Sequence, residues 1–244
     1  MLLLAGLGAG LTGSVAGLAS LISYPALLAV GLPPVTANVT NTVALVFSST
    51  GSIIGSQPEL VGQRRRVRQL VLAGALGGAV GAALLLATPA GSFELVVPVL
   101  IAVSSVAILV RRRVVSDLVA SAPQPVRLRV VVGVGVVGIY GGYFGAGAGV
   151  MLLSLLLLST HDTMPRSNAV KNVVLGVANG IAAVSFALFG PVRWLVVLPL
   201  GLGLFVGGRL GPIIVRRAPA GLLRVVIAAA GLGLSVKLGI EAYG

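Results

Sequence analysis

The sequence predicts an all-α polytopic membrane protein built of two inverted repeats, and three observations support this fold class. First, 57% of the residues are hydrophobic and 9% are charged, and the mean hydropathy is +1.10. Second, motifs of the first half return in the same order in the second half. Third, basic residues occupy loops in a pattern that places equivalent loops on opposite sides. So much apolar surface cannot be buried in one soluble core, so we expect lipid around the chain.

The apolar residues fall into eight segments joined by short connections. The first segment has no basic residues ahead of it and no clear small-residue cleavage site, so we interpret it as retained membrane structure and not as a signal peptide. The segments are 2–32, 35–56, 67–88, 93–111, 130–159, 166–189, 193–215 and 221–242.

Three motifs recur at nearly one offset, which indicates a duplication. Repeats of about 130 residues are typical of secondary transporters, whose binding sites lie where the repeats meet. We therefore divide the chain into a first repeat, residues 1–115, a cytoplasmic linker, residues 116–129, and a second repeat, residues 130–244. The matches are "GSVAGLAS" from Gly13 with "GYFGAGAG" from Gly142 (offset 129), "VTN" ending at Asn41 with "VKN" ending at Asn172 (131), and "GGAVG" from Gly77 with "GGRLG" from Gly207 (130).

The distribution of Lys and Arg indicates how the repeats are oriented. If all eight segments crossed the bilayer, the 17 basic residues would divide 11 to 6 between its sides. If segments 2–32 and 130–159 each enter and leave by one face, the division is 15 to 2, with only Arg193 and Lys237 on the less basic side. The positive-inside rule favours this second arrangement. It predicts six full spans, two re-entrant hairpins, cytoplasmic basic loops and both termini outside.

A re-entrant hairpin explains why the apolar stretch at residues 140–152, "YGGYFGAGAGVML", contains five glycines. Each arm of a hairpin needs only about 10 helical residues to reach the middle of the bilayer. Non-helical backbone at that depth must be buried in protein or line a cavity. The counterpart in the first repeat is "GSVAGLAS", and we expect the two tips to meet near the midplane.

A hairpin tip that leads into a helix presents free backbone N–H groups and the positive end of a helix dipole, which together suit an anion. The following span of each repeat adds asparagines, and the second adds a lysine. None of the five acidic residues is placed at mid-membrane, so a fixed carboxylate proton carrier is not expected and a small anionic substrate is. The candidate substrate-binding residues are Gly17, Ser20, Asn38, Asn41, Gly142, Gly145, Gly147, Gly149, Asn168, Lys171 and Asn172.

These candidates also have structural interpretations. The asparagines could cap helices or join neighbouring spans, and Lys171 could extend to the cytoplasmic interface. Glycines often serve only close helix packing, the role that we assign to "GALGGAVGAAL" from Gly74 and "GLGLFVGGRLG" from Gly201.

Other functional classes find little support. Cysteine is absent and the single histidine, His161, lies beside Asp162 in a predicted loop, so we expect no enzyme, no metal site and no cofactor. The basic residues gather near segment ends, which indicates contact with anionic lipid and not with nucleic acid.

In order and spacing, these motifs resemble the TauE/SafE family of membrane permeases, often described as sulfite exporters. The resemblance covers nearly the whole chain and implies a bacterial inner-membrane carrier of small sulfur-containing or organic anions, such as sulfite or sulfonates. The family's glycine-rich stretch maps onto Gly142, Gly145, Gly147 and Gly149, and its proline onto Pro25. The matching runs are "YPALLAVGLPPVTANVTNTVAL" from Tyr24, "GGYFGAGAGVMLL" from Gly141, "SNAVKNVVLGVANG" from Ser167, "GPVRW" from Gly190 and "GGRLG" from Gly207.

The chain departs from the family pattern in two places. Ala19 and Ser20 stand where the family often has consecutive glycines, which makes the first tip less open. Ser154 stands where a proline is expected in the second repeat.

We hypothesise a permease that works by alternating access, with the anion held between the two tips. Backbone N–H groups, Asn41 and Asn172 would coordinate it, and Lys171 would supply charge. A non-transporting scaffold or assembly subunit and an anion channel stay open as alternatives, although the sequence contains no charged ring or filter-like repeat. A homodimer is one assembly that the sequence leaves open.

Overall fold

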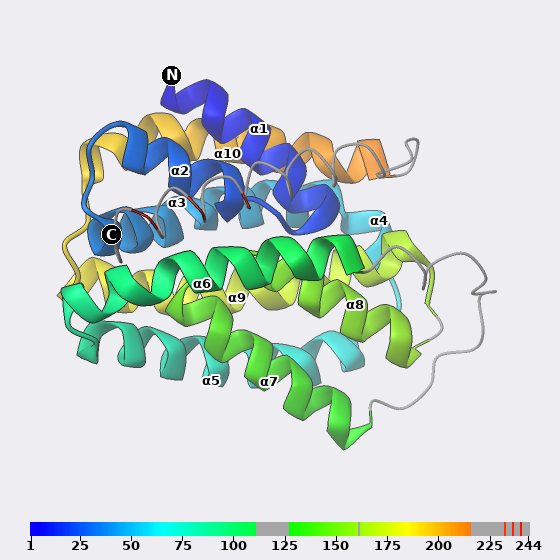
Figure 1. Ribbon diagram of the computed structural model, residues 1–244. Coiled ribbons are helices and arrows are strands. Elements are labelled where there is room, and N and C mark those ends of the chain that lie inside the picture. Colours follow the sequence, from blue (N-terminus) through cyan, green and yellow to red (C-terminus); the bar gives the residue numbers. More distant parts are fainter. Residues whose placement is uncertain (111–126, 161, 216–231, 233–235, 237–239, 241–244) are drawn as a thin grey trace.

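The computed structural model describes residues 1–110, 127–160 and 162–215, together with positions 232, 236 and 240 (Figure 1). Every regular element in these ranges is an α-helix, which confirms the all-α prediction there. Most of the expected span 221–242 and most of the expected linker 116–129 lie outside the described residues. The helices are α1 (Leu2–Ala16), α2 (Ser20–Ala29), α3 (Pro34–Gly55), α4 (Gln57–Leu60), α5 (Arg64–Ala87), α6 (Ala90–Val110), α7 (Leu128–Tyr143), α8 (Ala148–Thr160), α9 (Met164–Phe189) and α10 (Trp194–Val215).

Among the described residues, three helices are long and apolar enough to cross a membrane, namely α5, α9 and α10 as far as Ile214. The arms α1, α2, α7 and α8 are apolar but shorter. Helix α3 has 22 residues and buries a series of Asn, Thr and Ser side chains, among them Asn38, Asn41 and Ser52. The all-helical, apolar character is therefore established for the described residues, while the count of six spans stays a prediction.

Two helical hairpins form where the glycine-rich stretches interrupt the chain. Helix α1 ends at Ala16, and the next residue, Gly17, has a left-handed backbone (φ 78°, ψ 30°) and donates its N–H to the carbonyl of Gly13 at 2.7 Å. The second break, between α7 and α8, contains Gly145 at φ 78° and Gly147 at φ 76°. An L side chain is costly in this conformation, so these positions favour glycine. The Tyr140 hydroxyl donates to the Ala146 carbonyl at 2.7 Å and so ties the second tip to α7.

The hairpins open toward opposite ends of the bundle, as Figure 1 shows: α1–α2 toward its left and α7–α8 toward its right. At the left end, the N–H of Arg193, between α9 and α10, donates to the Thr40 hydroxyl of α3 at 3.0 Å. At the right end, Arg66 of α5 forms an ion pair with Asp162, which follows α8. A proline in the first turn helps to begin both α3 and α9, at Pro34 and Pro165.

Glycines bring two pairs of helices into backbone contact. A methyl group on Gly77 of α5 would overlap the Gly135 carbonyl of α7, and one on Gly207 of α10 would overlap the Leu7 carbonyl of α1. The packing role expected for the two glycine stripes is confirmed at these positions. Each contact joins one half of the chain to the hairpin of the other half.

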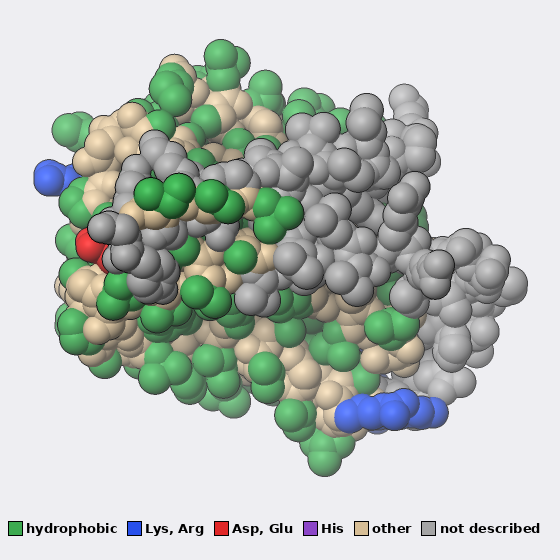
Figure 2. All heavy atoms as spheres, viewed as in Figure 1, with side chains coloured by type: hydrophobic (Ala, Val, Ile, Leu, Met, Phe, Trp, Pro, Cys, Tyr) green, Lys and Arg blue, Asp and Glu red, His purple; other side chains and the backbone are tan. Residues whose placement is uncertain are grey.

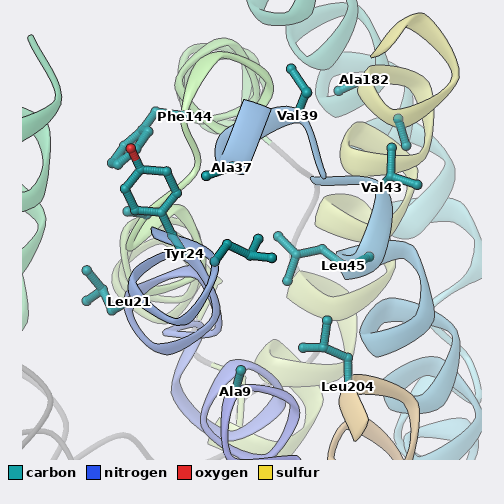
Figure 3. Close-up of a cluster of buried hydrophobic side chains, with 14 of the residues drawn as sticks. Ala9, Leu21, Tyr24, Ala37, Val39, Val43, Leu45, Phe144, Ala182 and Leu204 are labelled. Atoms are coloured by element: carbon teal, nitrogen blue, oxygen red, sulfur yellow. The ribbon is translucent and has the colours of Figure 1, made fainter. Parts of the chain in front are cut away.

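The main hydrophobic core surrounds the α1–α2 hairpin and includes α3, the start of α6, the tip of the second hairpin and the start of α10. Within it Tyr24 and Phe144 face each other edge to face, with ring centroids 5.4 Å apart (Figure 3). Phe93 of α6 adds a second edge contact to Phe144 at 6.1 Å. Aromatic packing of this kind fixes the second tip against the first hairpin.

Candidate functional site

The two hairpin tips touch at Gly17 and Gly149, as the sequence predicts. A methyl group on Gly17 would overlap the backbone of Gly149 and would lie 2.7 Å from the amide nitrogen of Val150. A methyl group on Gly149 would in turn overlap the α-carbon of Gly17. Glycine is therefore required at both positions by the close approach of the two backbones.

Beside this contact lies a cavity of about 60 Å³, larger than the roughly 10–15 Å³ that one water molecule requires. Both tips, α3 and α9 contribute to its wall. The lining residues are Gly13, Gly17, Ala19 and Ser20 from the first hairpin, Leu45, Ser48, Ser49 and Ser52 from α3, Gly145, Ala148 and Gly149 from the second hairpin, and Lys171, Asn172, Leu175 and Asn179 from α9.

The wall of this cavity is rich in hydrogen-bond donors. Helices α2 and α8 begin at it, and the N–H groups of Ser20 and Gly149 have no backbone acceptor within the described residues. The positive ends of two helix dipoles therefore point toward one small space. Serine hydroxyls, two asparagine amides and the ammonium of Lys171 add donors, and none of the described lining residues is acidic.

Lys171 is buried, with 1% of its surface exposed. Its Nζ donates to the carbonyl of Gly13 at 3.0 Å and approaches that of Ser14 at 3.4 Å. Both carbonyls belong to the last turn of α1, where the helix dipole is negative, so the helix stabilises the buried ammonium. The alternative in which Lys171 extends to the interface is wrong, because the side chain points into the protein.

Asn168 and Asn38 hold the hairpins in a reciprocal arrangement. Asn168 of the second half donates to the Ser14 carbonyl at the end of α1 at 2.8 Å. Asn38 of the first half donates to the Tyr143 carbonyl at the end of α7 at 2.9 Å. The two donors are 130 residues apart in the sequence and the two acceptors are 129 apart, close to the offset of 131 that aligns Asn41 with Asn172. Each half thus supplies an amide that caps the hairpin of the other.

The other two asparagines bind hydroxyl groups. Asn41 donates to the Ser20 hydroxyl at 3.2 Å and so holds the start of α2. Asn172 lines the cavity and donates to the Ser56 hydroxyl at 3.4 Å.

The glycine candidates divide into two groups. Gly145 and Gly149 line the cavity with Gly17. Gly147 shapes the second tip through its positive φ, and Gly142 packs against Gly78 of α5, whose carbonyl a methyl group would overlap.

Six of the sequence candidates line the cavity, namely Gly17, Ser20, Gly145, Gly149, Lys171 and Asn172. The remaining five, Asn38, Asn41, Gly142, Gly147 and Asn168, support the surrounding structure. The binding role of the whole set stays a prediction.

Sequence reasoning missed the polar wall that α3 and α9 add. Ser48 and Ser52 are one helical turn apart and follow Asn41 on one face of α3, and Asn179 follows Asn172 by two turns on α9. Polar side chains at helical spacing within apolar segments were the available signal for this wall.

Comparison with known proteins finds relatives that match nearly the whole chain. A family model described as "Sulfite exporter TauE/SafE" matches residues 2–238. The probable membrane transporter protein ORF9 of Sinorhizobium sp is 25% identical over 231 residues, which cover 94% of this chain and 88% of the relative. The probable membrane transporter protein YfcA of Escherichia coli strain K12 is 24% identical over 236 residues, covering 97% and 87%. No solved structure matches the chain. Because the family model extends over both hairpins and both halves, the chain belongs to the TauE/SafE sulfite exporter family.

Proposed function

We propose that this protein is a membrane transporter that moves a small anion through the contact between its two hairpin tips. The observation that carries the proposal is the donor-rich cavity beside Gly17 and Gly149, with the buried ammonium of Lys171 in its wall. Family membership, the names of the relatives and the three long apolar helices support a membrane transporter in general. The donor-rich wall of the cavity is the reason for proposing an anion as the transported substrate.

The proposed architecture is an inverted repeat with six full spans and two re-entrant hairpins, placed in a bacterial inner membrane. Two hairpins that open toward opposite ends, together with the reciprocal amides of Asn38 and Asn168, support it. In this arrangement the basic loops face the cytoplasm and both termini lie outside. We keep repeats of 1–115 and 130–244 as the proposed domains.

The preference for an anion has a clear electrostatic origin. At about 4 Å and an effective dielectric constant of about 20, a unit anion gains about 4 kcal/mol from an ammonium. Each helix N-terminus adds roughly 0.3–2 kcal/mol. Lys171 is therefore the largest single contribution, and the helix ends and hydroxyl groups orient the ligand. Following the description of the family, we propose an oxyanion of sulfur, sulfite or an organic sulfonate, as substrate.

The proposed mechanism is alternating access around this cavity. Each hairpin separates the cavity from one side of the membrane, and opening of one while the other stays closed would move the ion across. An anion that moves without a compensating ion gains about 2.3 kcal/mol per 100 mV when it leaves a cell that is negative inside, so we propose export.

Anion-dependent thermal unfolding in detergent tests the proposal. Sulfite, a simple sulfonate, sulfate and acetate should be compared at one ionic strength, since a ligand at 100 times its Kd stabilises by about 2.7 kcal/mol. We expect sulfite or the sulfonate to raise the Tm of the parent protein and not that of Lys171→Met. Arg193→Gln, which removes an exposed cation outside the cavity, should behave like the parent.

Proteoliposomes loaded with the same anions provide the second measurement. Equal efflux from parent and Lys171→Met proteins would contradict the site. Absence of both a thermal shift and efflux for every anion would favour a non-transporting scaffold, and efflux that saturates at no concentration would favour a channel.

A further inference from the structure

The four arginines at the start of α5 occupy two different environments. Arg66 is 12% exposed and forms an ion pair with Asp162. Arg64, Arg65 and Arg68 are exposed and have no acidic or hydrogen-bonding partner within the described residues. One arginine of the run therefore stabilises the loop between α8 and α9, and the other three are exposed on the surface of the described part of the molecule.

These three arginines converge on a surface hollow. Together with Gln69 and Leu72 they line a space of about 760 Å³. Arg64, Arg68 and Leu72 follow one another at one-turn intervals, so they share one side of the helix. Figure 2 shows that the side chains on the visible face are mostly apolar outside the grey atoms and that basic side chains lie near its edges. Neighbouring guanidinium groups repel each other, and a phosphate that accepts two hydrogen bonds from each fork relieves that repulsion.

An apolar stripe continues from the hollow along the same helix. Leu72, Leu76, Val80 and Leu84 are 61%, 71%, 47% and 49% exposed and recur at every fourth residue. The 12 residues between the ends of the stripe rise by about 18 Å at 1.5 Å per residue. One leaflet contributes about 15 Å of hydrocarbon, so the stripe is long enough to follow an acyl chain from the headgroup to the middle of the bilayer.

We propose that the start of α5 is a binding site for one anionic phospholipid. Its phosphate is bound by Arg64, Arg65 and Arg68, and one acyl chain lies along the stripe from Leu72 to Leu84. A free phosphate would contact only the arginines of the hollow. An acidic protein in the aqueous phase would not contact the apolar stripe, because in the proposed topology that stripe lies inside the bilayer. The continuity of hollow and stripe selects a lipid, and the site is independent of the anion cavity between the tips.

Bound lipid has a structural consequence because this corner of the molecule touches α9. Besides the pair of Arg66 with Asp162, Arg166 of α9 donates to the Val61 carbonyl at 3.3 Å. Lipid at the adjacent arginines therefore stabilises the loop before α5 and its attachment to α9.

Thermal unfolding of the full chain in detergent tests the site. Dioleoyl-phosphatidylglycerol should raise the Tm of the parent by several degrees more than dioleoyl-phosphatidylcholine at the same mole fraction. The triple variant R64Q/R65Q/R68Q should lose this difference. The control R127Q/R129Q/R193Q, which removes three exposed arginines elsewhere, should keep it. An equal loss in both triple variants would show diffuse attraction to a basic protein and would overturn the proposal, as would a phosphatidylcholine effect as large as that of phosphatidylglycerol.

Two further measurements separate the parts of the site. Native mass spectrometry should detect one retained phosphatidylglycerol per chain in the parent and in Leu198→Gln, and less in Leu76→Gln, since both leucines are highly exposed but only Leu76 lies on the stripe. Inorganic phosphate at millimolar concentration should not reproduce the thermal shift. A full shift with phosphate alone would mean a free-anion site, and unchanged lipid retention in both R64Q/R65Q/R68Q and Leu76→Gln would exclude the lipid site.

Discussion

The two hairpins occupy equivalent places in the two halves, yet they are held differently. The last turn of α1 receives an amide from Asn168 and the ammonium of Lys171. The last turn of α7 receives the neutral amide of Asn38. At the offset of 131 residues, Thr40 is the counterpart of Lys171, and its hydroxyl accepts an N–H from Arg193. Among the described residues, each hairpin therefore receives an amide from the other half of the chain, and only the first hairpin also receives a buried charge.

The tips also differ in how they interrupt the helix. The first uses a single left-handed residue, Gly17, before α2 begins at Ser20. The second uses two, Gly145 and Gly147, and a tyrosine hydroxyl to stabilise the wider turn. A short, closed tip thus faces a longer one, and the differences between them suggest four experiments.

The largest effect is expected where the tips touch. Gly149→Ala places a methyl group against the backbone of Gly17, which cannot move aside like a side chain, so we expect a loss of about 3 kcal/mol in the free energy of unfolding. Gly180→Ala is the control, because a methyl group there meets open space. Equal midpoints of chemical unfolding in detergent for the two variants would mean that the tips are apart.

The next effect concerns the charge that distinguishes the halves. Under the proposed function, Lys171→Met should weaken the apparent affinity for the anion at least tenfold, because the strongest attraction to it is lost. Thr40→Val should leave that affinity unchanged and lower stability by about 1 kcal/mol through its hydrogen bond. The anion concentration that gives half of the maximal thermal shift measures both. If Thr40→Val lost more affinity for the anion than Lys171→Met, the assignment of Lys171 as the main source of that affinity would be wrong.

A smaller difference separates the two amide clamps. Asn38→Ala leaves the Tyr143 carbonyl without a donor in the described part of the chain, and should cost about 2 kcal/mol. Asn168→Ala should cost about 1 kcal/mol, since Lys171 still approaches the Ser14 carbonyl at 3.4 Å. Thermal unfolding of both variants shows which one loses more stability. A larger loss in Asn168→Ala would mean that the Lys171 ammonium does not replace the Asn168 amide.

The smallest effect is expected at the ion pair beside the second hairpin. Asp162→Asn should lower stability by less than about 1 kcal/mol, because Arg66 and Asp162 are both partly exposed. The difference from the parent should shrink at high salt. A loss that is independent of salt would point to a structural role for this carboxylate beyond its charge.

Features that depend on local backbone chemistry could be predicted from the sequence. Helical arms of 10 to 16 residues and breaks at Gly17, Gly145 and Gly147 follow from apolar runs and from residues that tolerate a positive φ. The contact of the tips was predicted from the repeat and from the exchange of basic loops, since two arms of half-bilayer length would end at the same depth, and the contact of Gly17 with Gly149 agrees with that prediction.

Features that depend on packing between distant segments could not be predicted from the sequence in this way. The amide of Asn168 finds its acceptor 154 residues away and that of Asn38 finds one 105 residues away. An asparagine that caps a distant helix and one that contacts a ligand look alike in sequence. The serines of α3 were overlooked for a related reason, since the side of the helix that faces the cavity is decided by the neighbours of that helix.

The crosswise packing of the halves also has a consequence for biosynthesis. Helix α1 emerges from the ribosome before its partners Asn168, Lys171 and the glycines of α10, which are made late in the described chain. At about 5–20 residues per second, the first hairpin waits roughly 10–40 s for α10. During this interval its last-turn carbonyls and its glycine face lack their final partners. The nascent first half therefore depends on water, lipid or the insertion machinery until the second half closes around it.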